Sequence, residues 1–415
     1  MGTRALGPTL ACVVAVLSSS GLRGQNGLSG NDPIAVLDAR IAAGELTVTS
    51  RGVHGYLEGL LEALDIPLTS QGLVFSRTSL QTDRISPRAP RALYFNDDVY
   101  VGAVQGSPFL EVASIDPDEG ARFYTVNQDG GHRPVFQRET TLCLMCHDSK
   151  AVTGGVPGVI VLSVLADRLG YTIGSRQEGS VTDSTPFVRR FGGYYVTGTH
   201  GAPGHAGNTI SPLLAHEVTG RDAYVRSFTD AKADNVTDLS RRVNTGRYLT
   251  PHSDIVALLV LTHQAQVHNL IIQAHRAGHS TSTVPSLLEG AVDRLLSEML
   301  FVGEAPLSGP VRGTTDYARE FAARGPEDKQ GRSLRDLELD RRLFRYPLSF
   351  LIYSAAFDAL PDNVRHLFYA RLDAVLSGQD RDQDFAHLST ADRVAIREIL
   401  DATKPEFAAR RIAGR

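Results

Sequence analysis

The chain of 415 residues is long enough for one large domain or two of medium size, and its 42% hydrophobic content is ample for a buried core. Acidic and basic residues are interspersed along the chain and sum to a net charge of -4, without the basic stripe that binds nucleic acid. We therefore expect no nucleic-acid partner.

The first 22 residues have the layout of a secretory signal peptide. Arg4 supplies a positive charge, residues 9–17 form a short apolar core, and small residues follow at 18–21. This core is well below the roughly 20 residues that span a membrane. The pattern predicts cleavage near Ser20, export to the periplasm and a mature chain without a membrane span. A lipid-modified Cys12 is an alternative, but most of the apolar core would then follow the cleavage site.

Residues 25–210 are predicted to be rich in β-structure. Before the strands, Asp32 as cap and Pro33 at the first helical position predict a helix within residues 25–45, and a second short helix is expected at 56–64. Turn signals then separate short segments with strand-like composition. These segments are 73–75, 92–95, 99–104, 109–115, 122–126 and 159–165. The first five favour an antiparallel meander.

Residues 211–415 are predicted to be largely helical. Thr250 and Pro251 mark the start of a long helix that ends at Gly278, and Ser389 with Asp392 has the spacing of a capping box. The expected helices are 236–244, 251–277, 285–301, 333–344, 348–359, 362–377 and 389–402, with an exposed connection at 303–332. The predicted fold class is α+β, with the β-rich and helical regions packed as one unit.

Residues 143–147 read CLMCH and contain both cysteines that would remain after cleavage. A local disulfide or redox pair, a zinc site and covalent attachment of a c-type haem are the possible uses. Zinc normally takes four ligands, and the sequence has no second cysteine pair. Only haem attachment also uses His147, because the two thiols bind the porphyrin as thioethers and the adjacent histidine ligates the iron. We predict one covalent haem c held by Cys143, Cys146 and His147.

The ligand on the other side of the iron decides whether a haem carries electrons or binds a small molecule. Methionine is the usual distal ligand in small cytochromes, but after Met1 the chain has only Met145, inside the motif, and Met299, in an apolar helix. The sequence therefore does not indicate a small class I cytochrome c fold.

Histidine is the better source of a distal ligand. His268 and His263 lie on the predicted long helix about 140° apart, so both cannot point at one iron. Each is a candidate distal ligand, with a hydrogen-bonded core histidine as the alternative. His200 and His205 are weaker candidates in a Gly-rich loop, where surface histidines are the alternative.

Several longer segments carry a resemblance to a known group of proteins. CLMCH, FGGYYVTGTHG, HQAQVHN, SFLIYSAAFDALP and HLSTADRVAIREILDATKP together resemble exported bacterial cytochrome c domain-containing proteins with a single CxxCH. The resemblance implies a covalent haem on Cys143, Cys146 and His147, and electron transfer as the default role. Its recurrent histidine segments correspond to His200, His205, His263 and His268, without assigning them a role.

The expected function is that of a periplasmic single-haem c-type cytochrome that moves electrons between redox partner proteins. One alternative is a haem peroxidase or oxygenase with an open distal site and a small-molecule oxidant, in which His268 or His263 acts as acid and base. A second alternative is a haem-based gas or redox sensor.

Overall fold

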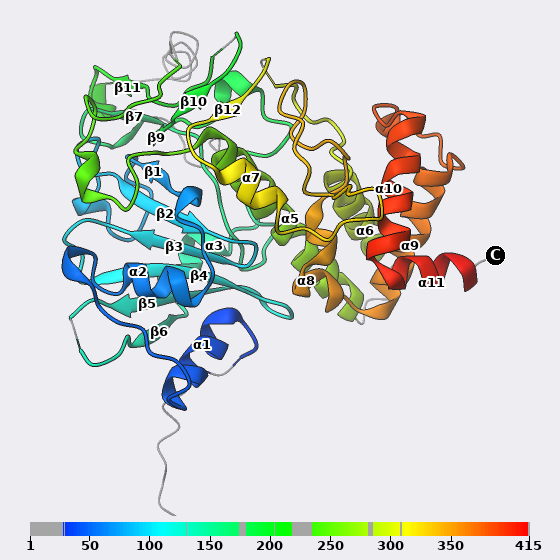
Figure 1. Cartoon of the computed structure of the whole chain (residues 1–415), viewed down its shortest axis with the longest axis horizontal. Helices are drawn as coiled ribbons and strands as arrows, with labels where there is room; N and C mark the ends of the chain where they lie inside the picture. The colour runs from blue at the N-terminus through cyan, green and yellow to red at the C-terminus, as the bar shows by residue number, and fades with distance from the viewer. Residues whose placement is uncertain are drawn as a thin grey trace, which may run out of the picture.

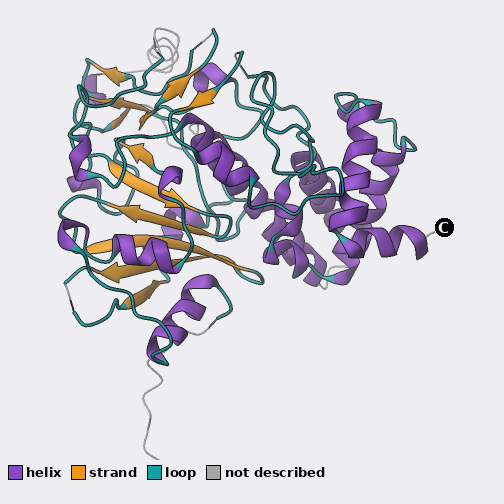
Figure 2. Ribbon diagram, in the orientation of Figure 1, coloured by secondary structure: helices purple, strands orange, loops and turns teal. Residues whose placement is uncertain are grey.

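An antiparallel sheet in the N-terminal half and helices in the C-terminal half give the α+β fold that the sequence predicts (Figure 2). The computed structural model describes residues 28, 30–129, 131–173, 180–202, 204–217, 235–280, 285–307 and 309–413. The predicted signal peptide, with Cys12, lies outside the described residues.

The main sheet has seven strands in the order β6-β5-β4-β3-β2-β1-β9. The predicted meander is present, because β1 to β5 follow one another and pair antiparallel, and β6 and β9 extend its two edges. Its strands are β1 (Gly72–Val74), β2 (Arg91–Phe95), β3 (Val99–Ala103), β4 (Phe109–Asp116), β5 (Gly120–Asn127), β6 (Phe136–Glu139) and β9 (Tyr194–Tyr195). The predicted strand at 159–165 is wrong for most of its length, since regular pairing begins only with β7 (Leu165–Asp167).

Short strands outside the main sheet form two small sheets. β7 lies between β8 (Thr172–Ile173) and β11 (Ile210–Ser211). β10 (Gly198–Thr199) pairs with β12 (Arg312–Gly313), which belongs to the helical half of the chain. This pairing joins the two halves, and it places a short strand within the expected exposed connection at 303–332.

The alternation of side chains along β4 and β5 gives the main sheet two packed faces. Leu110 and Val112 on β4 join the core beneath helices α1 (Pro33–Ala42) and α2 (Leu57–Ala63). On the opposite face, Phe123 belongs to the core built around helix α5. Figure 1 shows α2 on one side of the sheet, with the C-terminal helices gathered beyond α5.

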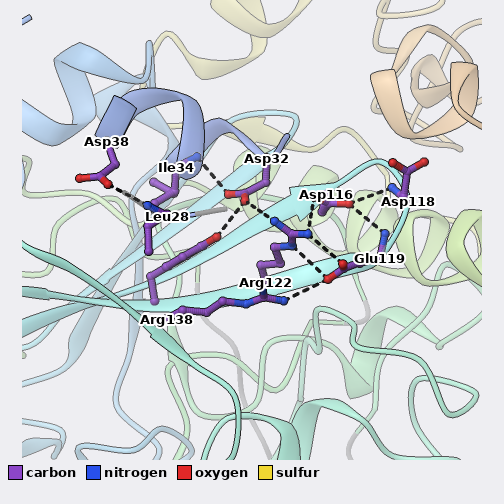
Figure 3. A network of polar contacts seen from close by, with 10 residues as sticks. Leu28, Asp32, Ile34, Asp38, Asp116, Asp118, Glu119, Arg122 and Arg138 are labelled. Carbon is purple, nitrogen blue, oxygen red and sulfur yellow. Dashed lines mark hydrogen bonds and ion pairs between the residues drawn. The ribbon is translucent and has the colours of Figure 1, made fainter. Parts of the chain in front are cut away.

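Helix α1 is fixed to the sheet by a buried charged network (Figure 3). Asp32 caps the helix, as predicted, and its carboxylate also accepts a hydrogen bond from Tyr124 at 2.8 Å. Arg122 on β5 pairs with Asp32 at 3.3 Å and with Asp116 at 3.1 Å. Because these groups are nearly inaccessible to water and are paired with one another, their burial is compensated and α1 has a defined position.

Helix α5 (Ile255–His279) runs through the core between the sheet and the C-terminal helices. It begins later than predicted, because the carboxylate of Asp254 accepts the backbone N–H groups of Val256 and Ala257 and so forms the cap. Within the described part of the chain, α5 is the one helix long and apolar enough to cross a membrane. Of its most apolar stretch, 94% is buried inside the protein, as in a core helix.

The remaining helices follow the sequence pattern with specific exceptions. They are α6 (Pro285–Met299), α7 (Tyr317–Ala322), α8 (Ala355–Asp358), α9 (Asp362–Ser377), α10 (Thr390–Thr403) and α11 (Pro405–Ala413). The predicted capping box at Ser389 and Asp392 is confirmed. The predicted helix at 348–359 is divided at Ser354 into a 3-10 turn and α8. The predicted helices at 236–244 and 333–344 are wrong. In the first, the Asp238 carboxylate accepts from the backbone and hydroxyl of Ser240, which favours a turn over a helix. In the second, the chain reverses to pair Leu337 with Phe344.

Candidate functional site

The CLMCH motif forms a single helical turn that the sequence patterns did not predict. Helix α3 (Leu144–His147) follows strand β6, and its turn closes with a 2.9 Å hydrogen bond from the His147 N–H to the Cys143 carbonyl. Cys143 is half-buried against the core, whereas Cys146 is exposed, and both thiols are free. Met145, between them, is 77% exposed. The motif therefore lies at the surface, with one thiol facing the protein and one facing solvent.

Among the described residues, His147 hydrogen-bonds through one ring nitrogen only. Its Nδ1 lies 2.9 Å from the Gly158 carbonyl oxygen, which can only accept, so Nδ1 carries the proton. The neutral ring then has its lone pair on Nε2. The Phe123 ring packs against the imidazole with a centroid separation of 4.6 Å. This arrangement, with Nδ1–H on a backbone carbonyl, is the one that orients a histidine to bind a metal through Nε2.

Residues 157–159 support His147, and each of the three is held by a different part of the molecule. The Pro157 carbonyl accepts from the backbone N–H of Ala121 on β5. The Gly158 N–H donates to the His147 carbonyl at 2.9 Å, so these two residues are joined by two hydrogen bonds. Val159 donates to Asn269 Oδ1 at 3.0 Å and accepts from its Nδ2 at 2.8 Å. The acceptor of the His147 proton is thus fixed from both sides.

A row of polar side chains on α5 holds the loop that follows the motif. Asn269, Gln273 and Arg276 lie on one face of the helix, four and three residues apart. Gln273 donates to the Thr153 carbonyl at 3.0 Å, and Arg276 donates to the Gly155 carbonyl at 2.8 Å. Together with Asn269, they anchor residues 153–159 to the core helix.

Burial governs the protonation of the motif. Burial lowers the pKa of His147, and the hydrogen bond to the Gly158 carbonyl opposes this shift. Burial, with smaller contributions from Glu111 and Glu139, raises the pKa of the Cys143 thiol to about 12. The buried Cys143 thiol is therefore a poor source of thiolate at neutral pH.

Across the described ranges, no group of three or more His, Cys, Asp or Glu side chains is arranged to hold a metal ion. A structural zinc site would need such a group. The groups that attach a c-type haem to the chain are two thiols and a histidine nitrogen, and the motif supplies Cys143, Cys146 and the Nε2 of His147.

His263, a candidate distal ligand, has both ring nitrogens occupied by protein groups. Its Nδ1 donates to the Asp183 carboxylate at 2.5 Å, and its Nε2 accepts from the Ser349 hydroxyl at 2.8 Å. Its ring stacks on Phe301 with 4.4 Å between centroids. The imidazole is fully buried. These contacts are those of a hydrogen-bonded core histidine, and they leave no lone pair for iron.

His268 faces the sheet instead. Its Nε2–H donates to the Asp97 carbonyl at 2.7 Å, and its buried Nδ1 has no hydrogen-bond partner among the described residues. Burial lowers the pKa of His268 to about 4, so the ring is neutral. It lines a cavity of about 10 Å³ that also touches Pro157 and Gly158. That volume suits one water molecule and is far too small for a porphyrin.

His200 and His205 lie near each other but far from the motif. Their ring centroids are 4.7 Å apart, in the segment that follows β9 and β10. The His147 ring packs on β5, five strand positions from β9, which is on the order of 20 Å across a sheet. Burial lowers the pKa of His205 to about 3. The structure does not bring this pair to the haem motif.

Gly158 and Asn269 are site residues that sequence reasoning missed. Gly158 is eleven residues beyond His147, in a stretch whose pairing is set by tertiary contacts. A usable signal was the spacing of polar residues at 269, 273 and 276 within an otherwise apolar helix, since buried amides must find partners.

No family model, curated protein or solved structure matches the chain.

Proposed function

We propose that this protein is an exported c-type cytochrome that carries one covalent haem on Cys143, Cys146 and His147 and transfers electrons. The observation that carries the proposal is the state of His147 within CxxCH: its Nδ1–H is held by the Gly158 carbonyl, so Nε2 is left free. The N-terminal sequence pattern supports export to the periplasm, where c-type haems are attached to their proteins.

In this proposal the haem supplies a one-electron couple, and the chain supplies attachment and orientation. Cys143 and Cys146 would hold the porphyrin, and the Nε2 of His147 would ligate the iron. Phe123 and Gly158 fix the plane of the imidazole. Exposed Cys146, with Leu142 and Met145 beside it in the chain, places the attachment point at the surface, where a redox partner protein can approach.

A second candidate function rests on the absence of an evident distal ligand. In the described part of the chain, His263 has both nitrogens occupied, His268 lines a water-sized cavity, and Met299 is buried in the core. An iron with an open second position binds small molecules. This arrangement favours a haem enzyme or gas sensor as the alternative to an electron carrier.

The decisive experiment is expression in a bacterial host that can mature c-type cytochromes, followed by denaturation and extraction with acidified solvent. Retained colour and the added mass of one haem would support the proposal, and loss of all colour would overturn it. The matched control is the double variant Cys143→Ser, Cys146→Ser, which should be colourless.

Carbon monoxide then separates the two candidate functions. A ferrous spectrum that does not change with carbon monoxide supports the electron carrier, because both axial positions are then filled. Rapid binding supports the enzyme or the sensor.

A further inference from the structure

Asn269 and the motif are distant in sequence but adjacent in the fold. Asn269 is 4% exposed, and both polar atoms of its amide bond the backbone of Val159, 110 residues earlier. The bond from the Val159 N–H holds the peptide that carries the Gly158 carbonyl, and the bond to the Val159 carbonyl holds the following peptide. Since the Gly158 carbonyl accepts the Nδ1 proton of His147, the amide determines where the acceptor lies.

The contact leaves no room for a side chain at Gly158. A Cβ added at this residue would lie 2.2 Å from Asn269 Oδ1 and 3.1 Å from the Thr153 side chain. The backbone here therefore approaches α5 more closely than any other residue type permits. Such packing holds the carbonyl in one place, which a loop held only by its ends would not do.

We propose that Asn269 is a positioning residue that tunes the reduction potential of the haem through the hydrogen bond between Gly158 and His147. The inference rests on the proposed haem attachment and goes beyond it by naming what controls the potential. A well-aligned carbonyl draws the Nδ1 proton away and makes the imidazole a stronger electron donor. A stronger donor stabilises ferric over ferrous iron and lowers the potential.

The distinguishing variant is Asn269→Leu, which removes both bonds to Val159 without adding charge. We expect a higher midpoint potential by spectroelectrochemistry, with the ferric-to-ferrous equilibrium shifted about tenfold, or about 59 mV for one electron. The matched control is Gln273→Leu, which frees the same loop at Thr153 but leaves Val159 held. Equal shifts in the two variants would overturn the inference, because the effect would then come from general loosening of the loop.

A second variant keeps the inference testable if leucine destabilises the fold. Asn269→Ala removes both bonds to Val159 and places a smaller side chain than leucine in the core. In the ferric protein, proton NMR should show the His147 Nδ1 proton exchanging faster than in the wild type. Exchange that matches the wild type would refute the positioning role.

Failure of this inference is distinguishable from failure of the proposed function. A denatured protein that retains its colour, combined with potentials and exchange rates unchanged by either Asn269 variant, would overturn the role of Asn269 alone. A protein without covalent haem would overturn both.

Discussion

Two histidine-bearing segments of the molecule differ in how completely their polar groups are used. On α3, His147 gives one nitrogen to the Gly158 carbonyl and keeps the other, beside two free thiols. On α5, His263 gives both nitrogens to Asp183 and Ser349 inside the core. A buried imidazole must be satisfied, so the fully paired His263 fits a structural role, whereas the Nε2 of His147, beside two thiols, fits a ligand site. The comparison supports the proposal that haem attaches at the motif.

The largest loss of stability should come from His263→Leu, which tests the structural role of this histidine. The substitution leaves the Asp183 carboxylate buried without its donor, so we expect a loss of about 3–5 kcal/mol in the free energy of unfolding. Urea denaturation followed by circular dichroism measures it. If haem is attached, its spectrum should stay the same. His147→Leu is the matched control, with a smaller loss of stability and an altered spectrum. A haem spectrum that changes with His263→Leu would show that this residue reaches the iron.

A smaller loss of stability is expected from Gly158→Ala, which tests how closely the loop beside the motif packs against α5. The new methyl group would collide with Asn269, so the loop must move, at a cost of about 1–3 kcal/mol. Urea unfolding gives the value, with Gly246→Ala as control, since a Cβ there lies 3.5 Å from the Asn244 side chain. Equal stability of the two variants would contradict the close contact between the loop and α5.

The pH dependence of stability tests whether Glu298, in the core beside His263, is buried as a neutral carboxyl. Burial, together with the nearby Asp183, raises the pKa of Glu298 to about 8, and its Oε1 has no partner among the described residues. Because this folded-state pKa exceeds the ordinary value of 4.5, the neutral carboxyl contributes stability that is present below pH 4.5. That contribution is lost as the pH rises toward 8.

Replacing this carboxyl by an amide should therefore stabilise the protein only at high pH. We expect Glu298→Gln to be more stable than the wild type by about 1 kcal/mol or more at pH 8, and no more stable at pH 4.5. Unfolding in urea at the two pH values is the measurement. The exposed control Glu45→Gln should differ by less than about 0.5 kcal/mol at both. A stabilisation independent of pH would reject the buried neutral carboxyl.

The smallest effect is expected at Met145, inside the motif. This side chain is 77% exposed, so Met145→Gln should change the unfolding free energy by less than about 0.5 kcal/mol. Haem attachment should be unaffected, because the chemistry depends on the spacing of the cysteines. Loss of attachment, seen by haem staining of a denaturing gel, would show that the intervening residue matters.

The sequence predicted the parts of the fold that depend on local patterns. The meander of β1 to β5, the Asp32 cap and the capping box at Ser389 each follow from periodicity or capping within a few residues. The predicted helix at 333–344 is wrong because tertiary contacts override its local pattern. There Arg335 pairs with Asp97 in the turn between β2 and β3, and Leu339 adopts a left-handed backbone with φ of 63°.

The same distinction applies to the candidate site. Spacing alone indicated Cys143, Cys146 and His147, because their chemistry requires them to be adjacent. The roles of Gly158 and Asn269 were not predicted, since the hydrogen bond between Val159 and Asn269 spans 110 residues. The angle between His263 and His268 was predicted from the helix period, but what each one faces depends on neighbouring elements.

Three elements hold residues 157–159, and this affects how the chain folds. A fragment ending before α5 would contain the complete motif and its β-sheet, yet the segment with the acceptor of the His147 proton would lose its hydrogen bonds to Asn269. Correct alignment of the imidazole therefore depends on closure of a very long loop, which is among the slower events in folding. If haem is attached, the time course of its absorption spectrum during refolding would report when the two halves of the chain meet.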